Sequence, residues 1–139
     1  MGLYGFQKRF VPYVKEGSKT HTIRAPRRIE DKPGNTFFGY FGLRTKAATK
    51  IIEAPYLRNE PIVIEPGEKR IEVSGVLLAE DEANDLAWRD GFRPSFYKEG
   101  HCLRDWPALD LMMLFFSLAK IKLFEGKMHH WDYSRRVIQ

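Results

Sequence analysis

The order of apolar and polar positions predicts a chain made of short strands. Residues 71–73 alternate between apolar and polar side chains, which is typical of a strand with one buried face. Residues 76–78 continue this segment as an apolar run and are expected to be buried. Runs of apolar or β-branched residues predict further strands at 3–6, 20–24, 36–41, 50–53, 61–65 and 121–124.

Helical spacing is confined to three places. Residues 10–14 predict a short helical turn that ends at Gly17, and residues 80–90 predict a helix with an acidic first turn that ends at Gly91. The third place is residues 108–119, which predict an almost wholly apolar helix. Because the strands and helices do not alternate in a βαβ order, we expect an α+β protein dominated by a small β-barrel with flanking helices.

Composition limits the class of protein. The length of 139 residues suits a single domain over 1–139, and a content of 43% hydrophobic and 29% charged residues is typical of a folded chain. Cys102 is the single cysteine, so we expect no disulfide and no zinc thiolate cluster. It lies in a loop-like stretch without a clear partner base, so we expect no cysteine nucleophile, and we expect no cofactor. The start of the chain does not resemble a secretory signal, and the most apolar stretch is too short to span a membrane. We therefore expect a cytoplasmic protein.

The positive charge is concentrated near the start of the sequence. Residues 1–50 contain 11 Lys and Arg and 3 Asp and Glu, a net charge of +8, whereas residues 51–139 contain 12 and 15, a net charge of −3. Clustered cations bind a polyanion by releasing the counterions that surround its phosphates. A solvated basic surface without a ligand is the alternative.

The segment Gly17–Arg24 has the densest group of polar side chains. Its glycine permits a sharp turn, and a strand after the turn would place Thr20, Thr22 and Arg24 on one face. Lys19 at the bend can reach the same space. Two cations around a hydroxyl can bind a phosphate or a carbonyl, or stabilise an oxyanion, although exposed strand starts have similar sequences.

This segment resembles the signature of the ASCH superfamily, in which a lysine follows a glycine by two residues and an arginine follows the lysine by five. Most of that superfamily has a glutamate where this chain has Thr22. The form found here is similar to the branch that includes bacterial acetylcytidine amidohydrolase. The resemblance extends over residues 6–41 and 71–92, and residues 115–131 also look like small bacterial and phage ASCH proteins. It implies a PUA-like barrel with a cleft that faces RNA or a nucleoside. It also implies that Lys19 and Thr22 are catalytic.

The third catalytic residue implied by the resemblance is Asp90, which lies at the position of a glutamate and is one methylene shorter. Lys19 is expected to lie close enough to Asp90 for an ion pair, because an aspartate at the end of a helix needs a compensating cation. A turn residue before Gly91 is the alternative interpretation of Asp90.

Further candidates would contact RNA rather than carry out chemistry. Arg24 belongs to the signature, and a basic strip is predicted along Arg27, Arg28, Arg44 and Lys46. Tyr40, Phe41 and Phe92 could stack on a base, although aromatic residues at such positions are more often part of the core. The pair His129 and His130 could contribute at most one acid/base side chain to the cleft, because neighbours on a strand point to opposite faces, and it is interpreted as a surface pair. Trp131 is interpreted as a core residue.

Two functions remain open. In the first, the chain is a hydrolase that needs no metal and acts on a modified nucleoside or on single-stranded RNA, with Lys19, Thr22 and Asp90 in catalysis and Arg24 stabilising the oxyanion. In the second, the same basic cleft binds RNA without cleaving it. The shorter Asp90 distinguishes the two, since a site that needs the longer glutamate could bind without turnover.

Overall fold

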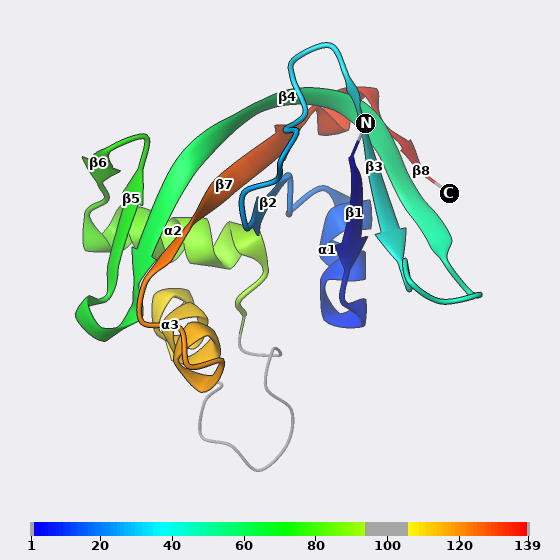
Figure 1. Ribbon diagram of the computed structural model, residues 1–139. Coiled ribbons are helices and arrows are strands. Elements are labelled where there is room, and N and C mark those ends of the chain that lie inside the picture. Colours follow the sequence, from blue (N-terminus) through cyan, green and yellow to red (C-terminus); the bar gives the residue numbers. More distant parts are fainter. Residues whose placement is uncertain (1, 94–105, 139) are drawn as a thin grey trace. The chain divides into compact units, whose positions relative to one another are not determined.

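The computed structural model describes residues 2–93 and 106–138, which form an α+β protein (Figure 1). The strands are β1 (Leu3–Phe6), β2 (His21–Arg24), β3 (Thr36–Phe41), β4 (Thr49–Glu65), β5 (Arg70–Val73), β6 (Val76–Leu77), β7 (Phe124–Trp131) and β8 (Val137–Ile138). The helices are α1 (Val11–Glu16), α2 (Glu80–Asp90) and α3 (Ala108–Leu118), and the short 3₁₀ turns are η1 (Lys8–Phe10), η2 (Pro66–Glu68) and η5 (Tyr133–Arg135). The predicted α+β class is therefore confirmed.

All eight strands of the described residues belong to one sheet. Its main path runs β1-β3-β4-β5-β6, while β7 pairs with both β2 and β4, and β8 pairs with β4. Strands β1 and β3 are parallel, and β3 with β4, β4 with β5, and β5 with β6 are antiparallel. Within the described ranges the pairing does not close on itself, so the predicted barrel is not confirmed.

The contacts of the chain divide it into two compact units. Unit 1 consists of Met1–Thr22, Pro26–Asn59 and His129–Gln139, and unit 2 consists of Ile23–Ala25 and Glu60–Met128. Strands β2, β4 and β7 each contribute residues to both units. The single domain over 1–139 stays a prediction, because both units are assembled from segments that alternate along the chain.

Stacked aromatic rings form the core of unit 1. The Phe37 ring stacks on Tyr4, with centroids 4.6 Å apart, and on Trp131, with centroids 4.2 Å apart. Both Tyr4 and Phe37 are fully buried, and Trp131 is 2% exposed. Such rings bury large apolar areas and have preferred stacking geometries, so they fix β1, β3 and the end of β7 together. The prediction that Trp131 belongs to the core is confirmed.

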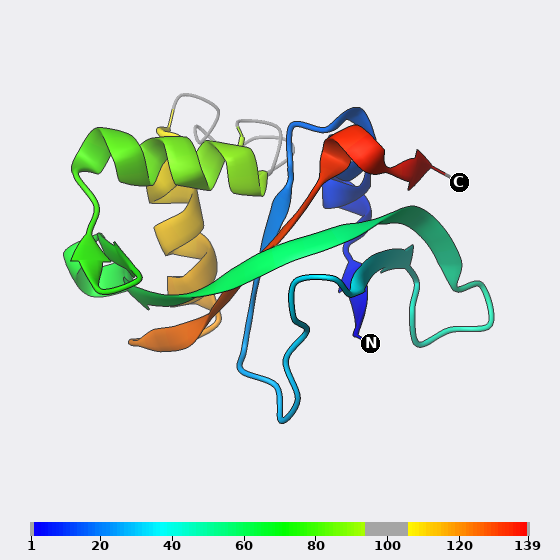
Figure 2. The same cartoon turned by 90° about the horizontal axis from the view of Figure 1, so that it is seen from above.

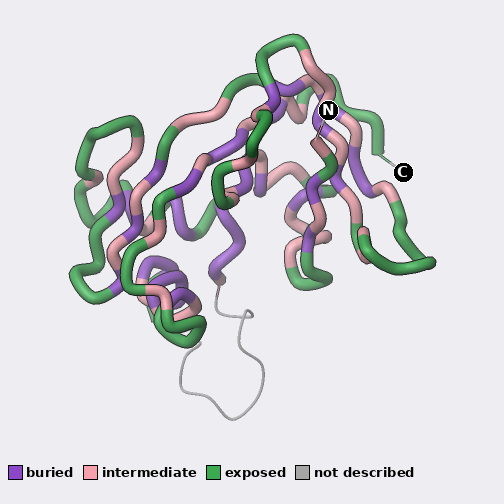
Figure 3. The backbone as a smooth tube through the Cα atoms, in the orientation of Figure 1, coloured by how far each residue is buried: buried purple, intermediate pink, exposed green. Residues whose placement is uncertain are grey.

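Unit 2 contains two helices that pack against each other, α2 and α3. The predicted helix at 80–90 is confirmed, because α2 begins at Glu80 and ends at Asp90. Gly91 adopts a left-handed conformation with φ 113° and ends the helix. Figure 3 shows α3 as largely buried, which agrees with its apolar sequence. Phe92 packs on Phe115 of α3 with ring centroids 5.5 Å apart, and it is 2% exposed. Phe92 is therefore a core residue, which was the alternative to its stacking on a base.

Three strand predictions need correction. The predicted strand through residues 71–78 is a hairpin, since Ser74 and Gly75 turn the chain between β5 and β6. Val76 and Leu77 are 64% and 51% exposed, so the predicted burial of this segment is wrong. The strands expected at 50–53 and 61–65 are parts of one long strand, β4, which Figure 2 shows without a break. The last predicted strand, 121–124, begins later and continues as β7.

Candidate functional site

The bend before β2 is formed by local hydrogen bonds in unit 1. Helix α1 ends at Gly17, whose φ of 90° is accessible to glycine at little cost. The amides of Gly17 and Lys19 both donate to the carbonyl of Tyr13, at 3.2 and 3.0 Å. These bonds turn the chain sharply and place Lys19 at the bend, as predicted.

The side chains of this segment are buried together. Lys19 is 2% exposed, His21 1% and Thr22 4%. The Lys19 ammonium lies 5.1 Å from the centre of the Phe10 ring, within the range of a cation–π interaction. Lys19 and Thr22, the two predicted catalytic residues of unit 1, are therefore buried and do not lie on a solvent-exposed strand.

His21 is a neighbour that the sequence did not single out. Its ring lies 6.0 Å from that of His130, at an angle of 49°. An imidazole can donate or accept a proton near neutral pH, so this ring adds an ionisable group next to Thr22. Strand alternation was the misleading signal here, because it assigns His21 and Thr22 to opposite faces although both are buried.

Asp90 is the last residue of α2 and is 7% exposed. The amide of Gly91 donates to the carbonyls of Ala87 and Trp88, which closes the helix just after the carboxylate. Asp90 belongs to unit 2, whereas Lys19 and Thr22 belong to unit 1. The ion pair between Lys19 and Asp90 therefore stays a prediction. Arg24, which is half-buried at the end of β2, is also assigned to unit 2.

The residues of the predicted basic strip differ in exposure. Arg28, Arg44 and Lys46 are exposed, as a polyanion-binding surface requires. The Arg27 guanidinium instead stacks on the Tyr4 ring, 4.0 Å from its centre, and donates to the carbonyl of Leu3 at 2.9 Å. Arg27 thus has a packing role within unit 1.

The aromatic candidates on β3 remain accessible in part. Tyr40 is half-buried, and Phe41 is 39% exposed. The two residues are adjacent on the strand, so they point to opposite faces and at most one of them can stack on a given base.

Cys102 lies outside the described residues.

A buried carboxylate network in unit 1 was not predicted. Asp31, which is 5% exposed, accepts hydrogen bonds from the Tyr4 hydroxyl at 2.7 Å, the Asn35 amide at 3.0 Å and the Gly2 backbone amide at 3.1 Å. Burial alone would raise the pKa of Asp31, but these donors outweigh it and hold the pKa below its usual value. Burial, assisted by the bond to Asp31, raises the pKa of Tyr4.

A second buried network surrounds His129, which is fully buried. The Tyr56 hydroxyl lies 2.6 Å from His129 Nδ1 and accepts a bond from the Asn59 amide at 3.0 Å. On its other side, His129 Nε2 lies 4.0 Å from Glu30 Oε1. Burial raises the pKa of Tyr56, so the phenol stays protonated and can donate to the imidazole. The interpretation of His129 as a surface residue is wrong, because the end of β7 belongs to the core of unit 1.

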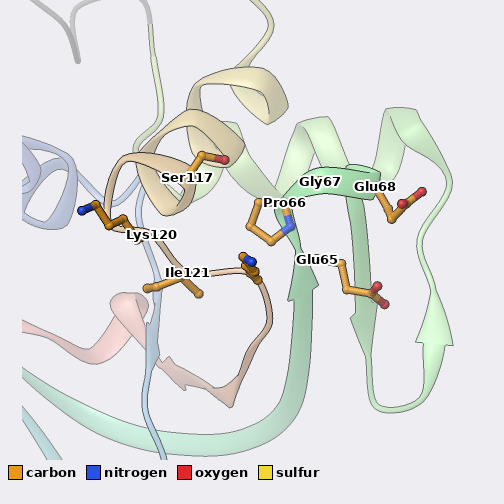
Figure 4. A pocket seen from close by; sticks show the side chains of 8 residues that line it. Glu65, Pro66, Gly67, Glu68, Ser117, Lys120 and Ile121 are labelled. Carbon is orange, nitrogen blue, oxygen red and sulfur yellow. The ribbon is translucent and has the colours of Figure 1, made fainter.

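The structure also has an open cavity of about 640 Å³ in unit 2 (Figure 4). The turn after β4 and the end of α3 line it with Glu65, Pro66, Gly67, Glu68, Ser117, Lys120, Ile121 and Lys122. In Figure 4 the carboxylates of Glu65 and Glu68 point away from Ile121. Acidic and basic side chains are equally represented, so the charges favour neither an anion nor a cation, and none of these residues was predicted for the site.

Within residues 2–93 and 106–138, no three His, Cys, Asp or Glu side chains form a group that could hold a metal ion. No helix in the same ranges has the length and apolar character needed to cross a membrane.

Comparison with protein-family models, with curated proteins and with solved structures finds no match for this chain. The resemblance to the ASCH superfamily consequently depends on the sequence alone.

Proposed function

We propose that the chain is a cytoplasmic protein of the ASCH type, with a PUA-like barrel, that hydrolyses a modified nucleoside or single-stranded RNA. The burial of the predicted catalytic side chains is the observation that supports this most. Among the described residues, the buried polar or charged side chains are Lys19, His21, Thr22, Asp31, Asp90 and His129. Half of them, Lys19, Thr22 and Asp90, are the three residues that the resemblance implies to be catalytic. Because burying an ionisable group costs free energy, the burial of Lys19 and Asp90 supports a functional reason for keeping them.

Each residue has a role in the proposed reaction. In one route the Thr22 hydroxyl attacks the acyl carbon of an acetylcytidine-type amide, the C–N bond breaks to release cytidine, and water then hydrolyses the acyl ester on Thr22 to acetate. In the other route Thr22 holds the water that attacks the acyl carbon directly. In both, Lys19 takes part in moving the proton from the attacking oxygen to the leaving nitrogen. The Arg24 guanidinium stabilises the oxyanion that forms on the carbonyl oxygen. Asp90 contributes the orienting carboxylate that the resemblance implies.

The test is hydrolysis of N4-acetylcytidine by the full chain, measured as release of cytidine by liquid chromatography. Turnover by the parent is expected, and Lys19→Ala or Thr22→Ala should lower kcat by roughly 100-fold or more. Asp90→Glu restores the longer acid of the resembling family and should keep or raise the activity. Asp90→Asn should lower it.

Two control variants accompany this test. Lys8→Ala removes an exposed lysine of unit 1, and Asp85→Asn removes an exposed carboxylate of α2. Both should leave kcat unchanged, because neither side chain is buried. Activity of the Lys19→Ala protein equal to that of the parent would refute the hydrolase proposal.

The second candidate, an RNA-binding module without turnover, is supported by the distribution of charge. Unit 1 contains 13 Lys and Arg and 5 Asp and Glu, a net charge of +8, whereas unit 2 contains 10 and 13, a net charge of −3. The exposed cations Arg28, Arg44 and Lys46 all belong to unit 1. Binding of single-stranded RNA without release of cytidine or RNA fragments would favour this module over the hydrolase.

A further inference from the structure

The bend that carries Lys19 has no room for a side chain at Gly17. A Cβ added there would lie 2.7 Å from ring carbons Cδ2 and Cζ of Tyr133, closer than real Cβ atoms approach other atoms. The backbone φ of 90° is itself unfavourable for any residue with a side chain. Gly34 is a useful comparison, because its φ is 99° but nothing lies within 4 Å of the corresponding Cβ. Of these two glycines, Gly17 is the one at which a neighbouring ring adds to the backbone constraint.

Tyr133 is held in place from its own side of the contact. Asp132 precedes it, donates its backbone amide to the carbonyl of Pro55 at 2.9 Å, and accepts a bond from the Ser134 amide at 3.0 Å. The Arg136 guanidinium covers the Tyr133 ring, 4.3 Å from its centre. These contacts fix η5 against β4 and present the ring to the bend.

The segment at the end of β7 contacts the bend on both sides of Lys19. On one side, the Tyr133 hydroxyl donates to the carbonyl of Lys15. On the other side, the Trp131 amide donates to the carbonyl of Thr20 at 3.3 Å. The two bonds therefore bracket the four residues 16–19, which include Lys19, and all of these groups belong to unit 1.

We propose that Tyr133 is the positioning residue for Lys19: its ring occupies the space above Gly17 and its hydroxyl fixes the end of α1, so that the lysine is held in its buried position. The catalytic importance of this positioning rests on the proposed function, but the positioning itself does not. Tyr133 acts through the bend and is not itself proposed to touch a substrate.

The test measures the reactivity of single lysines in the full chain. The protein is treated with an N-hydroxysuccinimide acetate, and mass spectrometry gives the acetylation rate of Lys19 relative to exposed Lys8. In the parent, Lys19 should react much more slowly than Lys8, because it is 2% exposed. In Tyr133→Ala the relative rate for Lys19 should rise about tenfold, since a hydrogen bond and ring packing are lost together. Tyr133→Phe keeps the ring and should remain close to the parent.

A second pair of variants decides the matter if Tyr133→Ala does not fold, as judged by circular dichroism. Gly17→Ala forces the ring away and should raise the relative rate for Lys19, whereas Gly34→Ala has the same kind of backbone strain without the ring and should not. Unchanged protection of Lys19 in folded Tyr133→Ala, or equal effects of Gly17→Ala and Gly34→Ala, would overturn the proposal. Lack of RNA binding and hydrolysis by the parent would instead overturn the proposed function and leave the reactivity result intact.

Discussion

At the scale of single residues, Asp31 has the clearest electrostatic consequence. Its folded pKa is lowered, so it is ionised in both the folded and the unfolded state above about pH 4, the usual range of aspartate, and its stabilisation is then fully present. The stabilisation is lost as the pH falls through the lower folded pKa. Tyr4→Phe removes the 2.7 Å donor and should lower the free energy of unfolding at neutral pH by about 1–3 kcal/mol. Urea unfolding at several pH values measures this.

The same variant predicts how the loss depends on pH. Without the Tyr4 donor the folded pKa of Asp31 rises toward its usual value, so the difference between parent and variant should shrink as Asp31 becomes protonated. Tyr40→Phe is the matched control, since the Tyr40 hydroxyl forms no hydrogen bond within residues 2–93 and 106–138. This variant should change stability little at any pH. A deficit of Tyr4→Phe that is equal at neutral and acid pH would contradict the role of Asp31.

At the scale of elements, local signals located the helices better than the strands. Gly17 and Gly91 marked both helix ends because a left-handed residue after a helix is a local requirement. The division of β4 into two strands failed because its middle contains Pro55, Asn59 and Pro61, residues that favour turns in isolation. Pairing with β3 at one end and β5 at the other keeps the chain extended despite them. Such pairing joins distant segments, so a local pattern does not contain it.

The hairpin between β5 and β6 was missed although its signal is local. A Ser-Gly pair marks a turn, and here Ser74 and Gly75 have φ values of 53° and 80°, which suit a two-residue turn with both residues left-handed. Asparagine tolerates this conformation better than serine, so Ser74→Asn should raise the free energy of unfolding by roughly 0.5–1 kcal/mol. Ser74→Val should lower it by about 1–3 kcal/mol, because a β-branched residue is strained at positive φ.

Urea unfolding of the full chain measures both changes. Gly75→Ala is the companion variant: nothing lies within 4 Å of its added Cβ, so it reports the backbone strain of the turn alone and should also destabilise the protein. Equal losses for Ser74→Asn and Ser74→Val would show that the turn conformation does not determine the effect of substitution at this position.

At the scale of the whole molecule, the sequence indicated which residues form the candidate site but not their surroundings. The spacing from Gly17 to Arg24 identified Lys19 and Thr22, and the structure buries both. The Asp31 and His129 networks were not predicted, because their members are brought together from β1, β4, β7 and the segment before β3. No periodicity relates residues so far apart. Net charge, in contrast, follows directly from the composition. It is +8 for unit 1 and −3 for unit 2.

This separation predicts that the full chain binds single-stranded RNA through unit 1 and that the affinity depends on salt. For single strands, the slope of log K against log salt is about −0.7 for each phosphate contact, so three contacts from Arg28, Arg44 and Lys46 correspond to roughly a 20-fold loss of affinity between 50 and 200 mM salt. Replacing all three by Ala should reduce the slope by about 2. Fluorescence anisotropy with a labelled oligoribonucleotide measures it.

The matched control removes the same charge from unit 2. Arg70, Lys120 and Lys122 are exposed, and replacing these three by Ala lowers the net charge of the chain by the same amount. If RNA lies on the basic surface of unit 1, this control should leave the slope almost unchanged, because the slope counts only the side chains that contact phosphates. Equal reductions for the two triple variants would mean that the RNA responds to net charge alone, and an affinity that does not vary with salt would exclude the basic surface altogether.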